Sequence, residues 1–540
     1  MSAAKRPNRA LALVAMTLAN SMILVDQTSV PLATPDLIRD LGASVSEGPW
    51  ILTANILPLA ALMVMGGRLG DLLGLRRVFL GGATLFVISS TLVGVSQDVV
   101  WAIAARALQG TGAALMMPTA LAIVSSIYPS GERGRALGIL AGASAFFAAL
   151  GPVLGGVLTA LDWRFVFLVN VPLAIVTIVL TLASVPDLKP LPGATRKLDY
   201  PGVITFGFGV GLIVFGLTQG NGGNWGNPEV VGSLIGSVVL LTAFVFVERH
   251  VENPLMDFRL FRHLNFLAAN ISQVLAGMVE LGMGYLLPFY LLIVIGISPE
   301  LAGLALIPAT IPIILAGPLA GRLFDRVGGR IPLVVGFLIL AASGVALGLG
   351  ADAQSYPALV PGLLLQGIGL GIVLTTNDPT GLTAVPDSDQ GQGSGMINTT
   401  EQLGGALGIA ALTAILLSDY LSRLTDRLHE LGITATPSDV SNTKEFILEA
   451  EQKGRGHVEA TGHVKVVLSD IVNTHAAAYE LTFFVAGGIS LLGALVCFLL
   501  VRRGDPVREG PLFSRRSRWI YTTAGRSSAV SKRPPLDRPG

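Results

Sequence analysis

Charged residues and cysteines are scarce in this chain of 540 residues, and each scarcity excludes a class of protein. Only 13% of the residues are Asp, Glu, Lys or Arg, whereas about a quarter is usual for a soluble protein. Cys497 is the single cysteine, so a disulfide within the chain is impossible and we expect no metal site. The net charge of +1 gives no reason to expect nucleic acid as a partner. The phosphate-binding sequence Gly-x-x-x-x-Gly-Lys-Ser/Thr does not occur, so ATP is not supported as an energy source.

Long apolar runs are what the chain has instead, and 51% of its residues are hydrophobic. About fourteen runs approach the ~20 residues that a helix needs to cross a bilayer. Glycine and proline are also numerous, as they are in membrane helices. The sequence therefore predicts an all-α polytopic membrane protein. The predicted spans are 10–32, 49–69, 77–96, 101–124, 135–158, 164–184, 200–217, 230–247, 265–296, 300–321, 331–350, 357–377, 391–417 and 480–502.

Basic residues gather on one side of these predicted spans. The short connections that would share the other side carry only Arg39 and Arg164. Such an excess marks the basic side as cytoplasmic. An even number of spans then places both termini there, so we expect a multi-pass protein of the cell membrane with both ends in the cytoplasm.

Two parts of the chain repeat one pattern. Asp71 and Asp325 lie 254 residues apart in similar charged segments, and Gln109 and Gln366 centre the same Leu-Gln-Gly tripeptide, 257 residues apart. The repeat predicts two six-helix bundles with two further helices between them. The expected divisions are a tail at 1–9, an N-terminal bundle at 10–184 and inserted helices with linkers at 185–264. A C-terminal bundle at 265–502 and a disordered basic tail at 503–540 follow. The C-terminal bundle includes an outer insert at 419–479, with a short amphipathic helix near 443–453.

Few ionisable residues lie inside the predicted spans, and each must find a partner or change its protonation state. Asp26 is either a proton carrier or gate contact, or a structural hydrogen-bonding group at the outer end of the first span. Arg106 cannot deprotonate, so it either sets the charge state of a nearby acid or forms a static pair between helices. Glu280 and Glu401 are candidates for proton binding or cation recognition, with pairing between helices as the alternative. We expect Asp378 to be an interface residue near a cytoplasmic helix end.

The fifth predicted span carries small residues on one face, namely Gly151, Gly155 and Gly156, together with Pro152. Close helix packing explains such a face. A pliable helix at the interface between the two halves also explains it, because Pro152 removes backbone hydrogen bonds and permits bending. These two interpretations are compatible.

Several motifs in order resemble the major facilitator superfamily, and within it the fourteen-span drug:proton antiporters of the EmrB/QacA type. Between the second and third spans, the pattern Gly-x-Leu-x-Asp-x-x-Gly-x-Arg-Arg resembles the family's loop signature, although Leu72 and Leu75 stand where basic residues are common. The first, fourth, fifth, sixth and thirteenth spans resemble the family's signatures too, but Glu401 replaces a commonly basic residue. The segments are 25–28, 106–110, 151–156, 163–172 and 398–405.

This resemblance implies roles for individual residues. The loop would act as a gate through Gly67, Asp71, Gly74, Arg76 and Arg77. The resemblance also implies an antiporter helix with Gly151, Pro152, Gly155 and Gly156, and proton coupling at Asp26 and Arg106. Glu280 and Glu401 join the proton-coupling candidates because they lie inside spans, and the candidates for a substrate cavity are Gln27, Gln109 and Asn398.

The implied function is proton-driven export of amphipathic or cationic lipophilic compounds by alternating access. It requires no cofactor beyond the proton gradient, and its partners would be the small-molecule substrate, protons and the lipid bilayer, with the chain acting as a monomer. We expect no enzyme activity, because no metal or nucleophile constellation is present. The alternatives are export of one endogenous metabolite or antibiotic, and a membrane receptor or scaffold that transports nothing.

Overall fold

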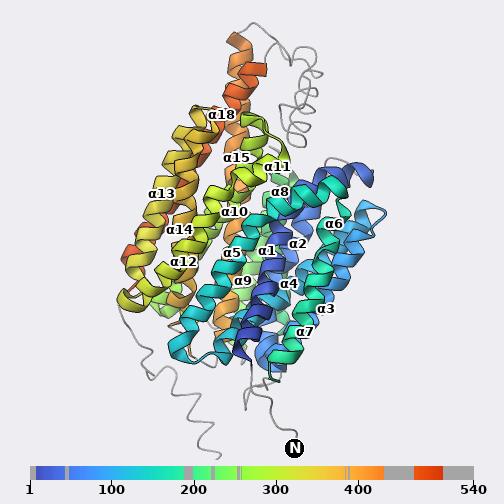
Figure 1. Cartoon of the computed structure of the whole chain (residues 1–540), viewed down its shortest axis with the longest axis vertical. Coiled ribbons are helices and arrows are strands. Elements are labelled where there is room, and N and C mark those ends of the chain that lie inside the picture. Colours follow the sequence, from blue (N-terminus) through green and yellow to red (C-terminus); the bar gives the residue numbers. More distant parts are fainter. Residues whose placement is uncertain are drawn as a thin grey trace, which may run out of the picture.

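A computed structural model describes residues 8–42, 48–187, 199–220, 225–251, 256, 258–383, 385–386, 390–430 and 468–502. Helices dominate these ranges, and no strand occurs in them (Figure 1). Fourteen helices in this part of the chain are long and apolar enough to cross a membrane. The prediction of an all-α protein with about fourteen spans is therefore confirmed. The predicted short helix near 443–453 and the tail at 503–540 lie outside the described residues.

The first six spans form an N-terminal bundle, and the sixth is built from two helices in succession. The helix is interrupted here because Pro172 lacks the backbone N–H that would continue the helical hydrogen bonding. The helices are α1 (Arg9–Asp40), α2 (Gly48–Leu73), α3 (Leu75–Gly94), α4 (Val99–Ile127), α5 (Ser130–Leu161), α6 (Arg164–Leu168) and α7 (Asn170–Ser184).

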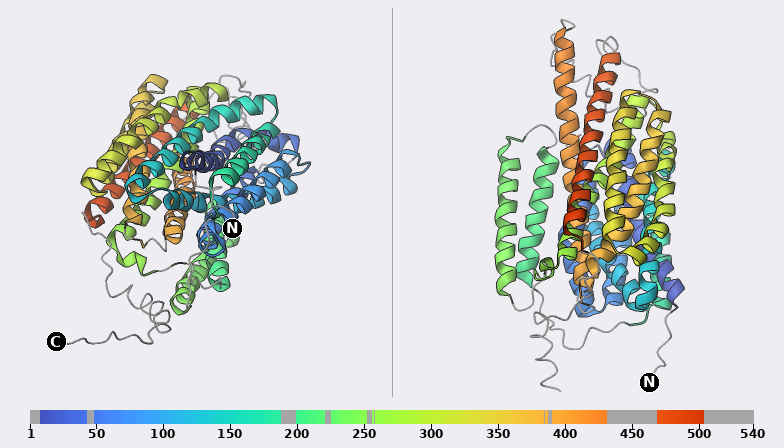
Figure 2. Two further views of the ribbon diagram at one scale, coloured as in Figure 1. Left: turned by 60° about the horizontal axis from the view of Figure 1, so that its bottom comes forward. Right: turned by 90° about the vertical axis from the view of Figure 1, so that its left-hand side faces the viewer.

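The next two spans pair with each other beside the bundles, and the last six form the C-terminal bundle (Figure 2). The pair is α8 (Tyr200–Gly220) and α9 (Pro228–His250), followed by the short 3-10 helix η1 (Leu260–Arg262). The C-terminal helices are α10 (Leu264–Tyr290) with its π-helical continuation η2 (Leu291–Ile295), α11 (Pro299–Ala305), α12 (Ile307–Val327), α13 (Arg330–Asp352), α14 (Tyr356–Leu382), α15 (Gln390–Glu430) and α18 (Leu468–Leu500).

Corresponding glycines make the same close contacts in the two bundles. A methyl group at Gly110 of α4 would lie 2.1 Å from the carbonyl oxygen of Asn55 in α2. A methyl group at Gly367 of α14 would lie 2.0 Å from the carbonyl oxygen of Ala309 in α12. Only glycine permits such an approach of two helices. The sequence repeat is therefore also a structural repeat.

The two bundles contact each other on two sides. On one side α2 packs against α15, and on the other α5 packs against α12 and α11. The first contact is close, since a methyl group at Gly395 would lie 3.3 Å from the Cα of Val64. Helix α8 packs against both α2 and α15, so the inserted pair is attached to both halves on that side.

The turn between α2 and α3 is shorter than the sequence predicts. Gly67 and Asp71 belong to the last turns of α2, and only Gly74 lies between the helices. Gly74 has a φ of 101°, and Gly328 at the corresponding point between α12 and α13 has a φ of 75°. Positive φ favours glycine at both points. Across the turn, Arg76 donates to the carbonyl oxygen of Leu182 at 3.1 Å, which joins the start of α3 to the end of α7.

The outer insert predicted at 419–479 is wrong in extent, because helices occupy both of its ends. Helix α15 continues to Glu430 and α18 begins at Leu468, so both rise beyond the other helices (Figure 1). Polar residues here still support a helix through pairs one turn apart, such as Asp419 with Arg423 at 2.6 Å. Arg427 and Asp470 then join the two helices at 2.8 Å. Low apolarity shortened the predicted spans, although the helices themselves continue.

Candidate functional site

Asp26 lies near the middle of α1, inside the N-terminal bundle. The prediction that it stands at the outer end of a helix is wrong, because α1 continues for fourteen further residues to Asp40. Its side chain is 1% exposed, and so is that of Arg106 on α4. An Nη1–Oδ2 distance of 2.5 Å joins the two. A buried carboxylate therefore faces a buried guanidinium, and removing either partner alone would leave an uncompensated charge.

Two amides complete the surroundings of the Asp26 carboxylate. Gln109 Nε2 of α4 donates to Oδ1 at 3.0 Å, and Asn170 Nδ2 of α7 donates to the same oxygen at 3.2 Å. Both amides also donate to Ser90 Oγ of α3, each at 3.2 Å. Ser90 in turn donates to the carbonyl oxygen of Phe167 at 2.9 Å. We call Asp26, Arg106, Gln109, Ser90 and Asn170 the Asp26 cage.

Arg106 keeps two further acceptors besides the carboxylate. Its Nε donates to the carbonyl oxygen of Ile51 at 3.0 Å, and its Nη1 also donates to Gln109 Oε1 at 2.7 Å. The guanidinium carbon lies 5.6 Å from the centre of the Phe167 ring, a cation–π distance. The guanidinium therefore stays solvated by protein groups even if Asp26 loses its charge.

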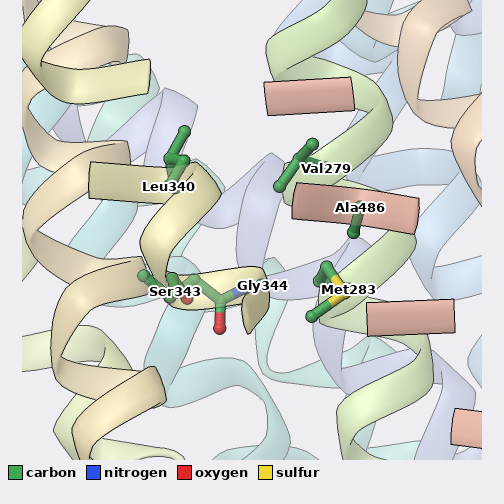
Figure 3. Close-up of a pocket in the computed structure, with 7 residues that line it drawn as sticks. Val279, Met283, Leu340, Ser343, Gly344 and Ala486 are labelled. Atoms are coloured by element: carbon green, nitrogen blue, oxygen red, sulfur yellow. The ribbon is translucent and has the colours of Figure 1, made fainter. Parts of the chain in front are cut away.

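The matching place in the C-terminal bundle is a small apolar pocket. Val279 and Met283 of α10 face α13 across it (Figure 3). Gln366 of α14 contributes a polar group to the lining. The carbonyl of Gln366 is buried and has no hydrogen-bond partner among the described residues. The full lining is Val279, Met283, Leu340, Ser343, Gly344, Gln366 and Ala486.

Each member of the cage except Gln109 has lost its polar group in this copy. Gly344 corresponds to Ser90. A methyl group at Gly344 would lie 2.7 Å from the carbonyl oxygen of Phe483, just as the Ser90 hydroxyl contacts the carbonyl oxygen of Phe167 at 2.9 Å. Two further pairs of corresponding residues follow from sequence spacing. Counting from Gln109 and Gln366 pairs Arg106 with Leu363, and counting from Phe167 and Phe483 pairs Asn170 with Ala486. The charged cage is thus confined to one half of the duplicated fold.

A second polar group lies in the C-terminal bundle, on α10, α14 and α15. Gln273 Nε2 donates to Glu401 Oε2 at 2.5 Å. Asn377 donates to Gln273 Oε1 and, at 3.0 Å, to the carbonyl oxygen of Ala269. Ser272 Oγ donates to Asn377 Oδ1 at 2.5 Å. The Glu401 carboxylate is thereby held by a chain of oriented amides.

Two more carboxyl groups lie near Glu401. Its charge acts on both Glu280 and Asp378. Glu280 Oε2 and Asp378 Oδ1 are buried and accept no hydrogen bond from the described residues. None of the ion pairs between described residues includes any of the three acids. We call Glu280, Asp378 and Glu401 the acidic cluster.

The comparisons with known proteins decide the family. The model of the Major Facilitator Superfamily matches residues 11–409. The chain belongs to the Major Facilitator Superfamily. That membership confirms the resemblance drawn from the motifs, and it confirms a transporter rather than an enzyme.

Relatives within the superfamily match most of the chain. The tetracenomycin C resistance and export protein of Streptomyces glaucescens is 30% identical over 92% of this chain and 93% of its own length. The puromycin resistance protein of Streptomyces alboniger is 35% identical over 78% of this chain and 84% of its own length. The multidrug resistance protein Stp of Mycobacterium tuberculosis is 31% identical over 83% of both chains.

Solved structures of superfamily members share the fold. The human organic anion transporter MFSD10 (TETRAN) aligns with a TM-score of 0.60 at 15% identity, over 91% of this chain and all of that one. An inward-facing bacterial homologue of the lysosomal transporter Spinster aligns with a TM-score of 0.57 at 16% identity, over 93% of this chain and all of that one. At such identities the likeness shows the fold alone.

The structure places both Asp378 and Glu280 near Glu401. Asp378 lies near a helix end, as expected, four residues before α14 ends at Leu382, and it also lies close to Glu401. Glu280 does not occupy the place that corresponds to Asp26, although it follows Asp26 by 254 residues. Its neighbour Val279 lines that place, and because successive helical residues are turned by about 100°, Glu280 points elsewhere and interacts with Glu401.

The three substrate-cavity candidates differ in outcome. Gln109 is fully buried, and its amide is engaged by Asp26, Arg106 and Ser90, so no part of it is free for a substrate. Asn398 donates to the carbonyl oxygen of Ser394 in its own helix at 2.8 Å. Gln27 remains a candidate, because neither end of its buried amide has a partner among the described residues.

The glycine face of α5 packs within the N-terminal bundle and not between the halves. A methyl group at Gly151 would lie 1.8 Å from Thr28 Oγ1, and one at Gly155 would lie 2.7 Å from the carbonyl oxygen of Ser29. Both contacts are with α1. Gly156 is buried as well, and α5 continues as a helix through Pro152. The prediction of close packing fits this face, and α5 itself also lies at the contact between the halves, where it packs against α11 and α12.

Sequence reasoning missed Ser90 and Asn170. Ser90 is one of many small hydroxyl residues in apolar spans, and nothing in its surroundings distinguishes it. Asn170 was visible only as part of the segment 163–172, although an amide inside an otherwise apolar span is a usable signal. Among the described residues, no three His, Cys, Asp or Glu side chains, those of the acidic cluster included, form a group that could hold a metal ion.

Proposed function

We propose that this chain is a proton-driven exporter of amphipathic, cationic or lipophilic small molecules. The Asp26 cage is the observation that carries the proposal. A buried carboxylate and guanidinium in direct contact are costly to keep in a membrane protein and are typical of proton relays. The names of the relatives, which include antibiotic export and multidrug resistance, support export as the direction.

Protonation of Asp26 provides the coupling step in this proposal. A proton that enters from the outer side binds the carboxylate. The net charge of the Asp26–Arg106 pair, which is 0 when Asp26 is ionised, then becomes +1. Arg106 retains Ile51 and Gln109 as acceptors, so the pair can loosen without leaving the guanidinium bare. Release of the proton on the inner side restores the ion pair. The bundles exchange access around this step, as in other transporters built from repeats.

The acidic cluster supplies a separate place for positive charge. Glu280, Asp378 and Glu401 lie in the half that has no charged cage, and no basic side chain pairs with them among the described residues. We infer that they hold the cationic group of a substrate or a second proton. In the same proposal the protein works as a monomer without ATP, and both termini lie in the cytoplasm.

Removing the charge of Asp26 tests proton coupling. Asp26→Asn keeps the size of the side chain and most of its hydrogen bonds, but it cannot bind and release a proton. In reconstituted vesicles with an imposed pH difference, we expect this variant to lose proton-driven substrate movement by at least about 100-fold, the lower end of the range for a general acid–base contribution. Asp36→Asn on the same helix is the matched control, because Asp36 pairs with Arg39 at an exposed position. Normal transport by folded Asp26→Asn would remove Asp26 from the mechanism.

A narrower function also has support, since several relatives carry the name of one compound, as with tetracenomycin C and puromycin. In this second proposal the chain exports one endogenous metabolite or antibiotic. A screen of structurally different dyes and antibiotics separates the two, because resistance to many compounds favours the first and resistance to one favours the second. The receptor or scaffold alternative rested on the insert at 419–479, part of which belongs to α15 and α18.

A further inference from the structure

The side-chain amide of Asn170 uses its N–H groups in the Asp26 cage but not its carbonyl oxygen. Its Nδ2 donates to Asp26 Oδ1 and to Ser90 Oγ. Its Oδ1 is buried and accepts no hydrogen bond from the described residues, and the residue as a whole is 1% exposed. A buried carbonyl without a donor is destabilising, so a further use for this oxygen is to be expected.

Proton binding changes what Asp26 requires from its neighbours. An ionised carboxylate only accepts hydrogen bonds, whereas a protonated one also donates through its O–H. Both amides around Oδ1 present N–H groups, so an O–H at that oxygen would face only donors. Gln109 cannot turn to help, because its Oε1 accepts from Arg106 at 2.7 Å.

Asn170 can turn, because rotation of its amide exchanges oxygen and nitrogen at almost the same positions. No bond is lost at Oδ1, which has none. The Ser90 hydroxyl can follow, since it can leave the carbonyl oxygen of Phe167 and donate to the turned amide. It still accepts from Gln109. The rotation therefore converts the donor at Asp26 into an acceptor.

We propose that Asn170 is a reversible positioning residue, which donates to ionised Asp26 and, after its amide rotates, accepts from protonated Asp26 with Ser90 following. The inference rests on the proposed proton coupling at Asp26. One proton passes from a hydronium ion to Oδ1, so an O–H bond breaks in that ion, which becomes water, and an O–H bond forms on Asp26. No other covalent bond changes, and the charge of the Asp26–Arg106 pair goes from 0 to +1. The cage thus hydrogen-bonds both protonation states of one acid.

The C-terminal bundle supplies an internal comparison. Where it lacks a carboxylate and a guanidinium, it also has no polar side chain at the positions of Asn170 and Ser90, which are Ala486 and Gly344. The nearby Ser343 donates instead to the carbonyl oxygen of Gly362 at 2.8 Å. Gln366 is retained. Asn170 and Ser90 therefore occur together with the titratable acid, whereas the glutamine does not depend on it.

Arg106 is the one charged side chain that touches Asp26 among the described residues. The groups that reach the carboxylate from packed helices are Arg106 and Gln109 of α4 and Asn170 of α7. Helix α3 contributes the Ser90 hydroxyl to the amides, and α2 contributes the Ile51 carbonyl to the guanidinium. The protonation response of the cage can therefore be assigned to one acid.

Infrared difference spectroscopy during a pH titration tests the proposal on the full chain in lipid. The band of the protonated acid is assigned by its absence in Asp26→Asn. We expect this band to shift in Asn170→Leu, which has a similar size and no hydrogen-bonding group, and in Ser90→Ala. Thr177→Val is the matched control on α7, because Thr177 is buried and its hydroxyl has no partner among the described residues. Ser89→Ala is the control on α3, since Ser89 bonds only to its own helix in the described contacts.

The outcomes separate the switch from its premise. A band at the same position in wild type and folded Asn170→Leu would show that Asn170 never accepts from the protonated acid, and this would overturn the proposal. Absence of any titrating band that depends on Asp26 would instead overturn the proton coupling itself. Proton-driven transport should fall about tenfold in Ser90→Ala, as for loss of one hydrogen bond near a charge. Ser90→Ala also keeps the test available if Asn170→Leu does not fold.

Discussion

At the scale of single residues, the main feature is a buried ion pair that is present in the N-terminal bundle and has no counterpart at the matching place in the C-terminal bundle. Asp26 and Arg106 are each 1% exposed, whereas Leu363 fills the place of Arg106 and is fully buried among apolar residues. Replacing a buried ion pair with well-packed apolar residues is often neutral or stabilising. Stability therefore does not explain why the charged version is kept in one half, and function does.

The contrast between the halves predicts the outcome of a double-mutant cycle. Arg106→Leu alone leaves Asp26 buried without its charge partner and should lower the free energy of unfolding by about 3–5 kcal/mol. Adding Asp26→Leu removes the orphaned charge, so the double variant should regain most of that stability. Proton-driven transport should be absent in both. Thermal unfolding in detergent measures the stabilities, and a double variant no more stable than Arg106→Leu would contradict the prediction.

Part of this site could be predicted from the sequence. Asp26 and Arg106 stand out because a charge in an apolar span is expensive, and this reasoning needs no structure. Their direct contact, and the inclusion of Gln109, depend on how the two helices α1 and α4 are turned about their axes. Ser90 is neutral and common in membrane helices, so no local cost marks it. Asn170 offers only the signal of an amide in an apolar span, and its contact with Asp26 and Ser90 is seen only in the structure.

At the scale of helices, apolar run length found the spans but not their ends. A span was predicted to end where polar residues begin, yet α15 continues to Glu430 because its polar residues pair along the helix. The reverse holds at Gly74, where one residue with positive φ ends α2 within a charged segment. Helix ends follow local hydrogen bonding and backbone angles, which hydropathy does not measure.

Glycines on α5 give a prediction at this scale. Gly155→Ala would drive a methyl group against the α1 backbone at Ser29, so we expect a loss of about 1–3 kcal/mol in the free energy of unfolding, as for overpacked cores. Gly142→Ala on the same helix meets nothing within 4 Å. It should be neutral or stabilising by up to ~1 kcal/mol, from the higher helix propensity of alanine. Thermal unfolding of both variants measures the difference, and equal stabilities would refute the assigned packing face.

At the scale of the whole molecule, duplication explains the architecture and asymmetry explains its use. The two bundles repeat the same glycine contacts, which the sequence repeat indicated. They differ in chemistry, because the N-terminal bundle holds the Asp26 cage and the C-terminal bundle holds the acidic cluster. The inserted helices α8 and α9 stand beside both bundles (Figure 2) and attach through α8 to α2 and α15. Relative movement of the bundles must therefore also move or slide past α8.

The contact between α2 and α15 provides the test of that movement. In alternating access the bundles must separate at their contacts in one of the two states, so a covalent link there should stop transport. Val64 and Gly395 are close enough for a disulfide between substituted cysteines, since a methyl group at Gly395 lies 3.3 Å from the Val64 Cα. We expect Val64→Cys with Gly395→Cys, in a Cys497→Ser background, to lose transport on oxidation and regain it on reduction. Each single cysteine variant, oxidised in the same way, is the control. Undiminished transport by the fully cross-linked protein would mean that this contact stays closed throughout the cycle, and that any movement of the bundles pivots about α2 and α15.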